Sequence, residues 1–205
     1  MIKVTAIKGS PRQQGYSSSL LEKFIESFQD KLQSCSESAE IDYLFPFEMD
    51  IKACKGCFSC SQTAICVFED DMRPLIQGGK FDESDVIILA TPIFFNGLPS
   101  HVKKLIDRCQ PIYASKYDLG NSIIDREKER KALLIACAGA PAYTDQFTAA
   151  TSVSDMFFKT LNSDKFEELL IPDTDSFSSR QPSRPARKAA KIGQKLAAEF
   201  IDEGK

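Results

Sequence analysis

Short apolar runs alternate with stretches of helical periodicity along the whole chain. Residues 2–7 are β-branched and apolar, and they lead directly into a loop over 8–15 that contains glycine and proline. Apolar residues then recur at three- and four-residue steps from Leu20 to Leu32, which predicts a helix with Ser17 or Ser18 as its N-cap. The chain therefore opens with a strand, a glycine-containing loop and a helix.

The same alternation continues to the C-terminal end of the sequence. Further apolar runs predict strands at 40–45, 86–90, 132–137 and 166–171. A short helix is predicted after Asp70 or Asp71, which would cap it, with Pro74 in its first turn and its end near 78–79. A second helix is predicted from the apolar face formed by Val102, Leu105, Ile106 and Cys109. Two more helices are predicted over 151–161 and 187–201. Residues 173–187 are rich in Ser, Pro and Arg, which indicates a connection within the domain.

Strands that alternate with helices predict an α/β protein in which a parallel sheet is covered by helices on both sides. Five strands suit the doubly wound, three-layer flavodoxin-like architecture with strand order 2-1-3-4-5, and the handedness of crossover connections leaves few other topologies. We expect one domain over 1–205, with a cysteine-rich insertion at about 50–70. Ligands in such sheets bind beyond the carboxyl ends of the strands, which here are the loops that start at Gly9, Thr91 and Ala138.

Composition narrows the possible functions. The 205 residues carry 26 Lys and Arg against 29 Asp and Glu, a net charge of −3, so a nucleic-acid partner is not expected. No apolar run reaches the length of a membrane span and no secretory signal is visible, so we expect a cytoplasmic protein that does not contact the membrane. Seven cysteines and one histidine exclude chemistry that needs several histidines. In a reducing compartment those cysteines are ligands, nucleophiles or small core residues.

The first loop has the features of a phosphate site. It lies between a strand and a helix N-terminus, where free N–H groups and the helix dipole favour an anion. Candidate side-chain contacts are Ser10, Arg12, Ser17, Ser18 and Ser19. The glycine spacing matches neither a Walker A loop nor the dinucleotide-binding fingerprint. The alternative interpretation is a serine-rich turn that only caps the helix.

The second and third loops are candidates for binding a planar ring. Residues of the second loop combine aromatic and apolar side chains with backbone donors: Pro92, Ile93, Phe94, Phe95, Asn96 and Gly97. Ala138 and Gly139 open the third loop at the same sheet edge. The alternative is a simple turn whose two phenylalanines belong to the core.

Three segments together resemble the NADPH-dependent FMN reductase superfamily, and within it the iron-sulfur flavoproteins most. They are Gly-Ser-Pro-Arg at 9–12, the cysteine run that leads to Asp-Asp-Met at 70–72, and Ala-Thr-Pro-Ile-Phe-Phe-Asn-Gly-Leu-Pro at 90–99 before Lys-x-x-Ile-Asp-Arg at 103–108. The resemblance spans residues 1–137. It implies FMN with its phosphate at the first loop and its ribityl chain and ring at 92–97, and it implies dimers. Tyr16 stands where the family usually has Asn.

The most specific motif is Cys54-x2-Cys57-x2-Cys60-x5-Cys66. Four thiolates on one short loop, with Gly56 between them, suit a [4Fe-4S] cluster. Zinc also accepts four cysteines, but usually from two separated pairs. A redox-labile loop without metal is the remaining alternative. The other cysteines, Cys35, Cys109 and Cys137, are expected to be small buried residues, and His101 a surface or core residue.

These motifs predict an oxidoreductase in which the cofactors carry the chemistry and no side chain acts as catalytic acid or base. FMN accepts one or two electrons and the cluster one, so the pair connects one-electron carriers such as ferredoxin with two-electron acceptors such as oxygen, peroxide or a quinone. The family resemblance implies a homodimer or a dimer of dimers, in which the aromatic segment 111–117 is a candidate contact, and NAD(P)H is a possible donor. The alternatives are a cluster-free NAD(P)H-dependent FMN or quinone reductase, and a non-catalytic flavin carrier or zinc-stabilised module.

Overall fold

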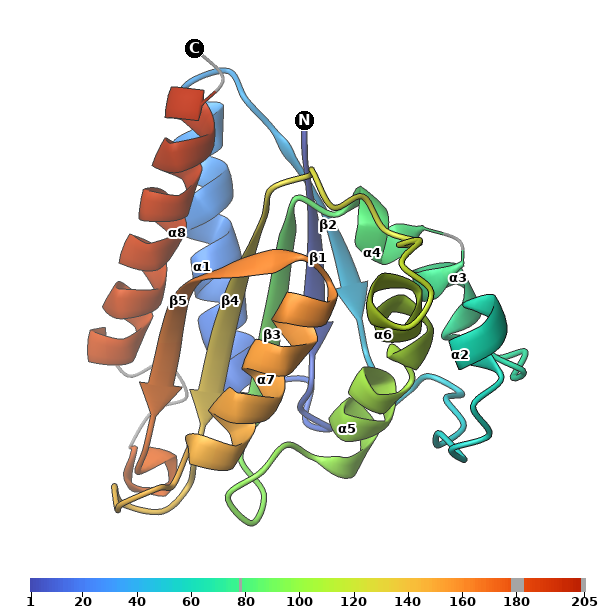
Figure 1. Ribbon diagram of the computed structural model, residues 1–205. Helices are drawn as coiled ribbons and strands as arrows, with labels where there is room; N and C mark the ends of the chain where they lie inside the picture. Colours follow the sequence, from blue (N-terminus) through green and yellow to red (C-terminus); the bar gives the residue numbers. More distant parts are fainter. Residues whose placement is uncertain (78, 178–182, 204–205) are drawn as a thin grey trace.

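The computed structural model describes residues 1–77, 79–177 and 183–203, and its centre is a five-stranded parallel sheet (Figure 1). The strand order is β2-β1-β3-β4-β5, and every neighbouring pair is parallel. The strands are β1 (Ile2–Lys8), β2 (Ala39–Leu44), β3 (Val86–Pro92), β4 (Arg130–Cys137) and β5 (Ser163–Ile171). This is the flavodoxin-like order expected from the sequence.

Helices cover both faces of the sheet. On one face lie α1 (Tyr16–Gln33) and α8 (Ser183–Glu203), side by side in Figure 1. The other face carries α3 (Arg73–Ile76), α4 (Lys80–Glu83), α5 (Ser100–Asp107), α6 (Gln110–Tyr117) and α7 (Thr148–Thr160). Beyond this face lies α2 (Cys60–Thr63), and a short 3-10 helix, η1 (Thr174–Ser176), follows β5.

The two faces of the sheet contribute to two hydrophobic clusters. Alternate strand residues point to opposite faces, so Val4 and Ala6 pack against α1 and α8, whereas Ile7 packs with the helices opposite. The contact between α1 and α8 is unusually close, because a Cβ atom on Gly193 would lie 2.4 Å from the carbonyl oxygen of Phe24. Glycine is required there because any side chain would push the two helices apart.

Several predicted element ends were wrong. The N-cap of α1 is Gly15, and Ser17 and Ser18 lie within the first turn. Asp70 and Asp71 do not cap α3, whose N-cap is Met72 without a side-chain bond. The short helix ends at Ile76, and residue 78 of its predicted end lies outside the described residues. A separate helix, α4, follows.

Two further helix boundaries differ from the prediction. The helical face predicted from Val102 to Cys109 consists of two helices, since Cys109 is the N-cap of α6 and Pro111 lies in its first turn. The closing helix begins at Ser183 rather than Arg187. The predicted connection 173–187 therefore includes η1 and the start of α8, and its residues 178–182 lie outside the described residues.

The isolated cysteines and the aromatic segment behave differently from one another. Cys109 and Cys137 are buried as predicted, whereas Cys35 is exposed at the end of α1, so that prediction was wrong. His101 is half-buried, and its Nε2 lies 2.9 Å from the carbonyl oxygen of Gly9. Segment 111–117 is mostly buried, with Tyr117 its one exposed aromatic side chain.

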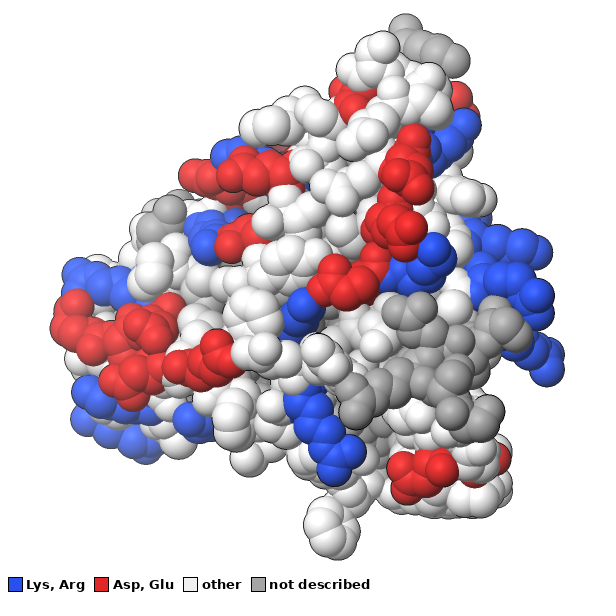
Figure 2. Space-filling model, turned by 180° about the vertical axis from the view of Figure 1, so that it is seen from behind, with Lys and Arg blue, Asp and Glu red and all other residues white. Residues whose placement is uncertain are grey.

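Charged side chains of both signs are interspersed on the face shown in Figure 2, so no continuous basic field covers the part of that face that the structure describes. Over residues 1–77, 79–177 and 183–203, no helix is both long and apolar enough to cross a lipid bilayer.

Candidate functional site: two adjoining loop cavities

The first candidate site is an open cavity of about 560 Å³ at the carboxyl edge of the sheet. Four of its walls follow the ends of β1, β3, β4 and β5, which is where a doubly wound fold binds ligands. Its lining residues are Ser10, Pro11, Arg12, Gln14, Gly15, Tyr16, Ser17, Pro92, Ile93, Phe94, Cys137, Gly139, Thr174 and Asp175. The volume lies in the usual range for cofactor sites.

The loop after β1 is held by close backbone packing. A Cβ atom on Gly9 would lie 2.7 Å from Cγ2 of Val102, so only glycine allows β1 to approach α5 this closely. The N–H of Gly9 donates to the carbonyl oxygen of Ala90 at 2.7 Å, and that of Gly15 donates to Arg12 at 3.0 Å. The loop therefore places the N-terminus of α1 at the cavity.

The N-terminus of α1 is open to an anion. Its N-cap, Gly15, offers no side-chain oxygen to the first N–H groups, and no acidic residue lies in the first turn. Such uncapped N–H groups, together with the helix dipole, favour a phosphate. Ser10, Arg12 and Ser17 add side-chain donors to the same cavity. The arrangement fits a monophosphate group.

Tyr16 and the segment after β5 close one side of the cavity. The hydroxyl of Tyr16 donates to the carbonyl oxygen of Phe177 at 3.2 Å, and the two rings meet edge to face with centroids 5.6 Å apart. Thr174 donates through its hydroxyl to Ala138 at 3.1 Å, and the Asp175 carboxylate lies against Gly139. The tyrosine that departs from the family pattern thus anchors the fourth loop of the site.

The loop after β3 forms a tight turn beside the same cavity. Phe94 and Gly97 exchange both backbone hydrogen bonds at 3.0 Å, and Phe95 and Asn96 between them have positive φ values of 49° and 61°. Phe95 projects into solvent, and the hydroxyl of Tyr143 from the third loop donates to the side-chain oxygen of Asn96. Phe94 and Phe95 are exposed. The alternative interpretation, in which both phenylalanines belong to the core, was therefore wrong.

The cavity gathers about half of the residues that the sequence predicted as cofactor contacts. Those that line it are Ser10, Arg12, Ser17, Pro92, Ile93, Phe94 and Gly139. Those outside its lining are Ser18, Ser19, Phe95, Asn96, Gly97 and Ala138; the Ser18 hydroxyl is buried and has no partner within the described chain. Sequence reasoning missed Gln14, Thr174 and Asp175. The end of β5 was the available signal for the last two, because it lies at the same sheet edge.

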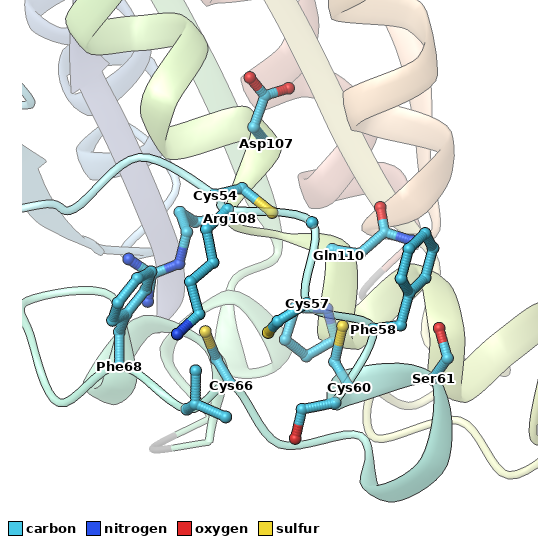
Figure 3. A pocket seen from close by; sticks show the side chains of 15 residues that line it. Cys54, Cys57, Phe58, Cys60, Ser61, Cys66, Phe68, Asp107, Arg108 and Gln110 are labelled. Atoms are coloured by element: carbon cyan, nitrogen blue, oxygen red, sulfur yellow. The ribbon is translucent and has the colours of Figure 1, made fainter.

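The second candidate site is a cavity of about 240 Å³ between the cysteine segment and the α5–α6 junction. All four clustered cysteines line it, and Figure 3 shows the thiols of Cys54, Cys57, Cys60 and Cys66 directed toward the same space. Cys54 and Cys57 are exposed and the other two are half-buried. All four predicted cluster ligands therefore line one cavity.

Irregular backbone shapes this second cavity. Gly56 has a φ of +65° with no atom within 4 Å of a Cβ position, and Phe58 also has a positive φ, 60°. These left-handed residues turn the chain so that Cys54, Cys57 and Cys60 face inward. Only Cys60 lies on regular structure, at the start of α2.

The thiols interact with one another electrostatically. Burial raises the pKa of the Cys60 thiol, and the neighbouring Cys66, Cys54 and Cys57 raise it further. Four thiolates gathered this closely repel one another unless a cation offsets their charge, and metal ions supply such charge. The donor set fits an iron-sulfur cluster chemically. Within the described residues, no group of three or more His, Cys, Asp or Glu is arranged to hold a single metal ion.

A buried arginine that the sequence analysis left without a role forms the wall behind the cysteines. Arg108 follows α5, and its side chain is 1% exposed. Its guanidinium donates twice to Asp70, at 2.5 and 3.0 Å, and once to the carbonyl oxygen of Lys52 at 2.8 Å. Asp70 also accepts the N–H of Lys52 and of Met72. Asp71 accepts the N–H of Asp50. Both predicted cap residues thus accept hydrogen bonds from the segment that precedes the cysteines.

Comparison with known proteins agrees with this geometry. The model of the NADPH-dependent FMN reductase family matches residues 2–149. The chain is 29% identical over 111 residues to an iron-sulfur flavoprotein of Methanocaldococcus jannaschii, which covers 54% of this chain and 53% of that protein. It is 34% identical over 122 residues to an iron-sulfur flavoprotein of Archaeoglobus fulgidus, covering 60% and 56%. The chain spans about half the length of the curated relatives it matches.

Solved structures share the fold over nearly the whole chain. An azoreductase from Bacillus anthracis superposes with a TM-score of 0.69 at 15% identity, covering 98% of this chain and all of that one. An FMN-dependent NADH-azoreductase from Bacillus anthracis, in complex with FMN, gives 0.68 at 16% identity, covering 98% and 99%. The likeness at this identity concerns the fold. The family match over residues 2–149 shows that the chain belongs to the NADPH-dependent FMN reductase family.

Proposed function

We propose that this protein is an FMN-dependent oxidoreductase that also carries a [4Fe-4S] cluster and passes electrons between one-electron carriers and two-electron acceptors. One observation carries the proposal: four thiols line one cavity on the same chain as an uncapped helix N-terminus at a sheet-edge cavity. Membership of the FMN reductase family supports the flavin, and the names of the relatives support the cluster.

FMN would occupy the sheet-edge cavity. Ser10, Arg12, Ser17 and the first N–H groups of α1 would hold its phosphate. Residues 92–97 and the start of the third loop, Ala138 and Gly139, would flank the ribityl chain and ring. Asp175 is the acidic group in this lining, and its place beside Gly139 keeps it on the β4–β5 side.

The cluster would be held by Cys54, Cys57, Cys60 and Cys66. Its ligands must be thiolates, so binding displaces protons and favours the gathered arrangement of these side chains. Flavin and cluster supply the redox chemistry, since one takes one or two electrons and the other takes one. The protein's own residues bind, orient and shield these groups, and no side chain is assigned a role as catalytic acid or base.

We further propose a cytoplasmic protein with a single domain over 1–205, including the cysteine insertion at about 50–70, that forms a homodimer or a dimer of dimers. Exposed aromatic side chains beside the sheet-edge cavity, Phe94 and Phe95, support the assembly because large exposed apolar groups mark interaction sites. A ferredoxin-like carrier is the proposed one-electron partner.

A cluster-free NAD(P)H-dependent FMN or quinone reductase is the second candidate. The exposure of Cys54 and Cys57 favours it, and so does the description of the matching family model as NADPH-dependent. In that case the cysteine loop contributes nothing to electron transfer. The two candidates differ in which electron donor reduces the flavin.

Anaerobic stopped-flow measurement of flavin bleaching separates the two. Photoreduced ferredoxin and NADPH serve as donors for the wild type, for Cys57→Ser, and for Cys35→Ser as the control outside the cavity. We expect ferredoxin to reduce the flavin of the wild type and of Cys35→Ser, with a rate at least tenfold lower in Cys57→Ser. Bleaching by NADPH alone, at one rate in all three proteins, would overturn the proposal in favour of the second candidate.

A further inference from the structure

The wall behind the four cysteines presents the positive end of a buried ion pair. Arg108 lines the cysteine cavity with a side chain that is 1% exposed, and its partner Asp70 is equally buried. The guanidinium carbon lies 4.9 Å from the centre of the Phe68 ring, and the ammonium groups of Lys55 and Lys52 lie 5.2 and 5.7 Å from the same ring. Three cations therefore lie near one aromatic ring at the edge of the thiol cavity. Figure 3 shows Arg108 and Phe68 beside the cysteines.

Arg108 is held in one orientation yet retains donors. A guanidinium has five N–H donors, and here Asp70 and the carbonyl oxygen of Lys52 take three of them. The Nε–H is buried and has no acceptor within the described residues. Arg108 and Cys66 both line the cysteine cavity, whereas Asp70 is not part of its lining, so the guanidinium lies on the cavity side of the ion pair.

A second buried arginine in the same chain shows which of these features matters. Arg130, the first residue of β4, is also fully buried, pairs with Asp82, and also has an Nε–H without an acceptor. Its other contacts are the carbonyl oxygens of Asp125, Lys128 and Asp82, and it lies outside the lining of the cysteine cavity. An unpaired Nε–H is therefore not itself a sign of a ligand. The position beside the thiols distinguishes Arg108 from Arg130.

A buried cation next to four thiolates has a defined electrostatic effect. Each electron added to a thiolate-ligated cluster makes the site one unit more negative, and reduction potentials depend on net charge and on hydrogen bonds to the sulfurs. A fixed positive charge in a medium of low dielectric constant stabilises the more negative state, and buried charges are screened little by salt. Asp70 balances the charge of Arg108, but it is not part of the cavity lining, so the cysteines face the positive end of the ion pair.

We propose that Arg108 is a positioning residue for the cysteine-bound cluster, and that its guanidinium, oriented by Asp70, Lys52 and Phe68, donates to a sulfur and raises the reduction potential. The inference rests on the proposed function, because it needs the cluster that the cysteines would bind. It assigns a role to the Arg of Lys-x-x-Ile-Asp-Arg at 103–108, which lies outside the cysteine motif.

The test is an anaerobic redox titration followed by EPR on holoprotein with bound FMN. The double variant Arg108→Gln/Asp70→Asn removes both charges, so that no buried carboxylate is left unpaired and folding is preserved. Arg108→Lys keeps the charge without the two-pronged geometry. Arg130→Gln/Asp82→Asn is the control, since it removes the ion pair of another buried arginine away from the cysteines.

We expect the equilibrium constant for one-electron reduction of the cluster to fall about tenfold in Arg108→Gln/Asp70→Asn, which corresponds to a midpoint potential lower by about 59 mV. Arg108→Lys should restore part of this shift, and Arg130→Gln/Asp82→Asn should leave the potential unchanged. Loss of acid-labile sulfide from Arg108→Gln/Asp70→Asn, with FMN retained and the control intact, would also support the proposal.

An unchanged potential and sulfide content in Arg108→Gln/Asp70→Asn would overturn the inference, and so would an equal shift in the control or a raised potential. Failure of the proposed function looks different. In that case the wild type itself contains no iron or sulfide, and no cluster signal is available in any variant.

Discussion

The sheet-edge cavity and the cysteine cavity are built in different ways. The first is formed by loops that follow regular strands, and its proposed anion-binding groups are mainly backbone N–H donors at the start of an 18-residue helix. The second consists of side chains on an irregular segment, in which only Cys60 belongs to a helix, and that helix has four residues. One buried ion pair, Arg108 with Asp70, ties the irregular segment to the rest of the fold.

This difference predicts how each site responds to amino-acid substitution. Substitutions other than those to proline leave the backbone N–H donors in place. A single substitution should therefore weaken ligand binding at the sheet-edge cavity only in part. The cysteine cavity depends on particular side chains, so substitution of one cysteine should abolish cluster binding. The following predictions test that contrast, beginning with the largest effect.

Substitution of one clustered cysteine should abolish one site and spare the other. Because a [4Fe-4S] cube needs all four thiolates, Cys57→Ser should lose nearly all iron and acid-labile sulfide. FMN content should stay at the wild-type value, since none of the lining of the sheet-edge cavity comes from this segment. Metal and flavin analysis after anaerobic purification checks this, with the exposed Cys35→Ser as control. Parallel loss of FMN would show that the two sites are not independent.

Breaking the buried ion pair should destabilise the protein in a pH-dependent way. Asp70→Asn leaves the Arg108 charge buried without a partner, which costs about 3–5 kcal/mol of unfolding free energy. Burial raises the Asp70 pKa, but hydrogen bonds from Arg108, Lys52 and Met72 outweigh this and hold it below 3.8. The stabilisation is therefore complete above pH 3.8 and is lost as the pH falls through the lower folded-state pKa.

Urea unfolding of wild type and Asp70→Asn across that pH range measures this prediction. The difference in unfolding free energy should be constant at neutral pH and should shrink below pH 3.8. A difference that is independent of pH down to the acid limit would mean that the carboxylate charge contributes nothing.

A methyl group at Gly9 should damage the sheet-edge cavity more than the cysteine cavity. Its Cβ atom would lie 2.7 Å from Val102 and 3.0 Å from Thr91, and such overpacking costs about 1–3 kcal/mol. Thermal unfolding and FMN titration of Gly9→Ala should both show the loss. Gly97→Ala is the matched control for thermal unfolding, because the nearest atom to its Cβ would be 3.8 Å away. Equal effects of the two substitutions would contradict the packing argument.

The smallest effect is expected from the exposed arginine of the first loop. Arg12→Ala removes one charge from a site that keeps its backbone donors, so FMN affinity should fall about tenfold, or about 1.4 kcal/mol. Riboflavin lacks the phosphate, and its affinity should not change. Fluorescence titration with both ligands measures the difference, and Lys23→Ala on the same segment of chain serves as control. A similar loss for riboflavin would place the phosphate elsewhere.

The sequence predicted the fold well because the apolar pattern records burial directly. Runs such as 86–90 are buried on both faces and carry no polar residue, so both the strands and their order followed. The roles of individual polar residues were harder to predict. Asp70 looked like a helix cap because cap residues and ion-pair partners share the same chemistry, and its partner Arg108 lies 38 positions further along the chain.

The two sites were predictable to different degrees. Cysteine spacing identified the whole thiol set, because a compact motif keeps its ligands close in sequence and in space. The sheet-edge cavity draws on four loops, and the contribution of Thr174 and Asp175 depends on how the segment after β5 folds back toward Tyr16. Exposure of Cys35 was missed because a lone cysteine at a helix end gives no pattern.

The central claim is that one chain holds both a flavin and a cluster, and analysis of protein purified anaerobically with sufficient iron tests it most directly. We predict one FMN with about four iron and four acid-labile sulfide per chain, and an EPR signal from the cluster on reduction. Protein that contains stoichiometric FMN but no acid-labile sulfide would contradict the claim.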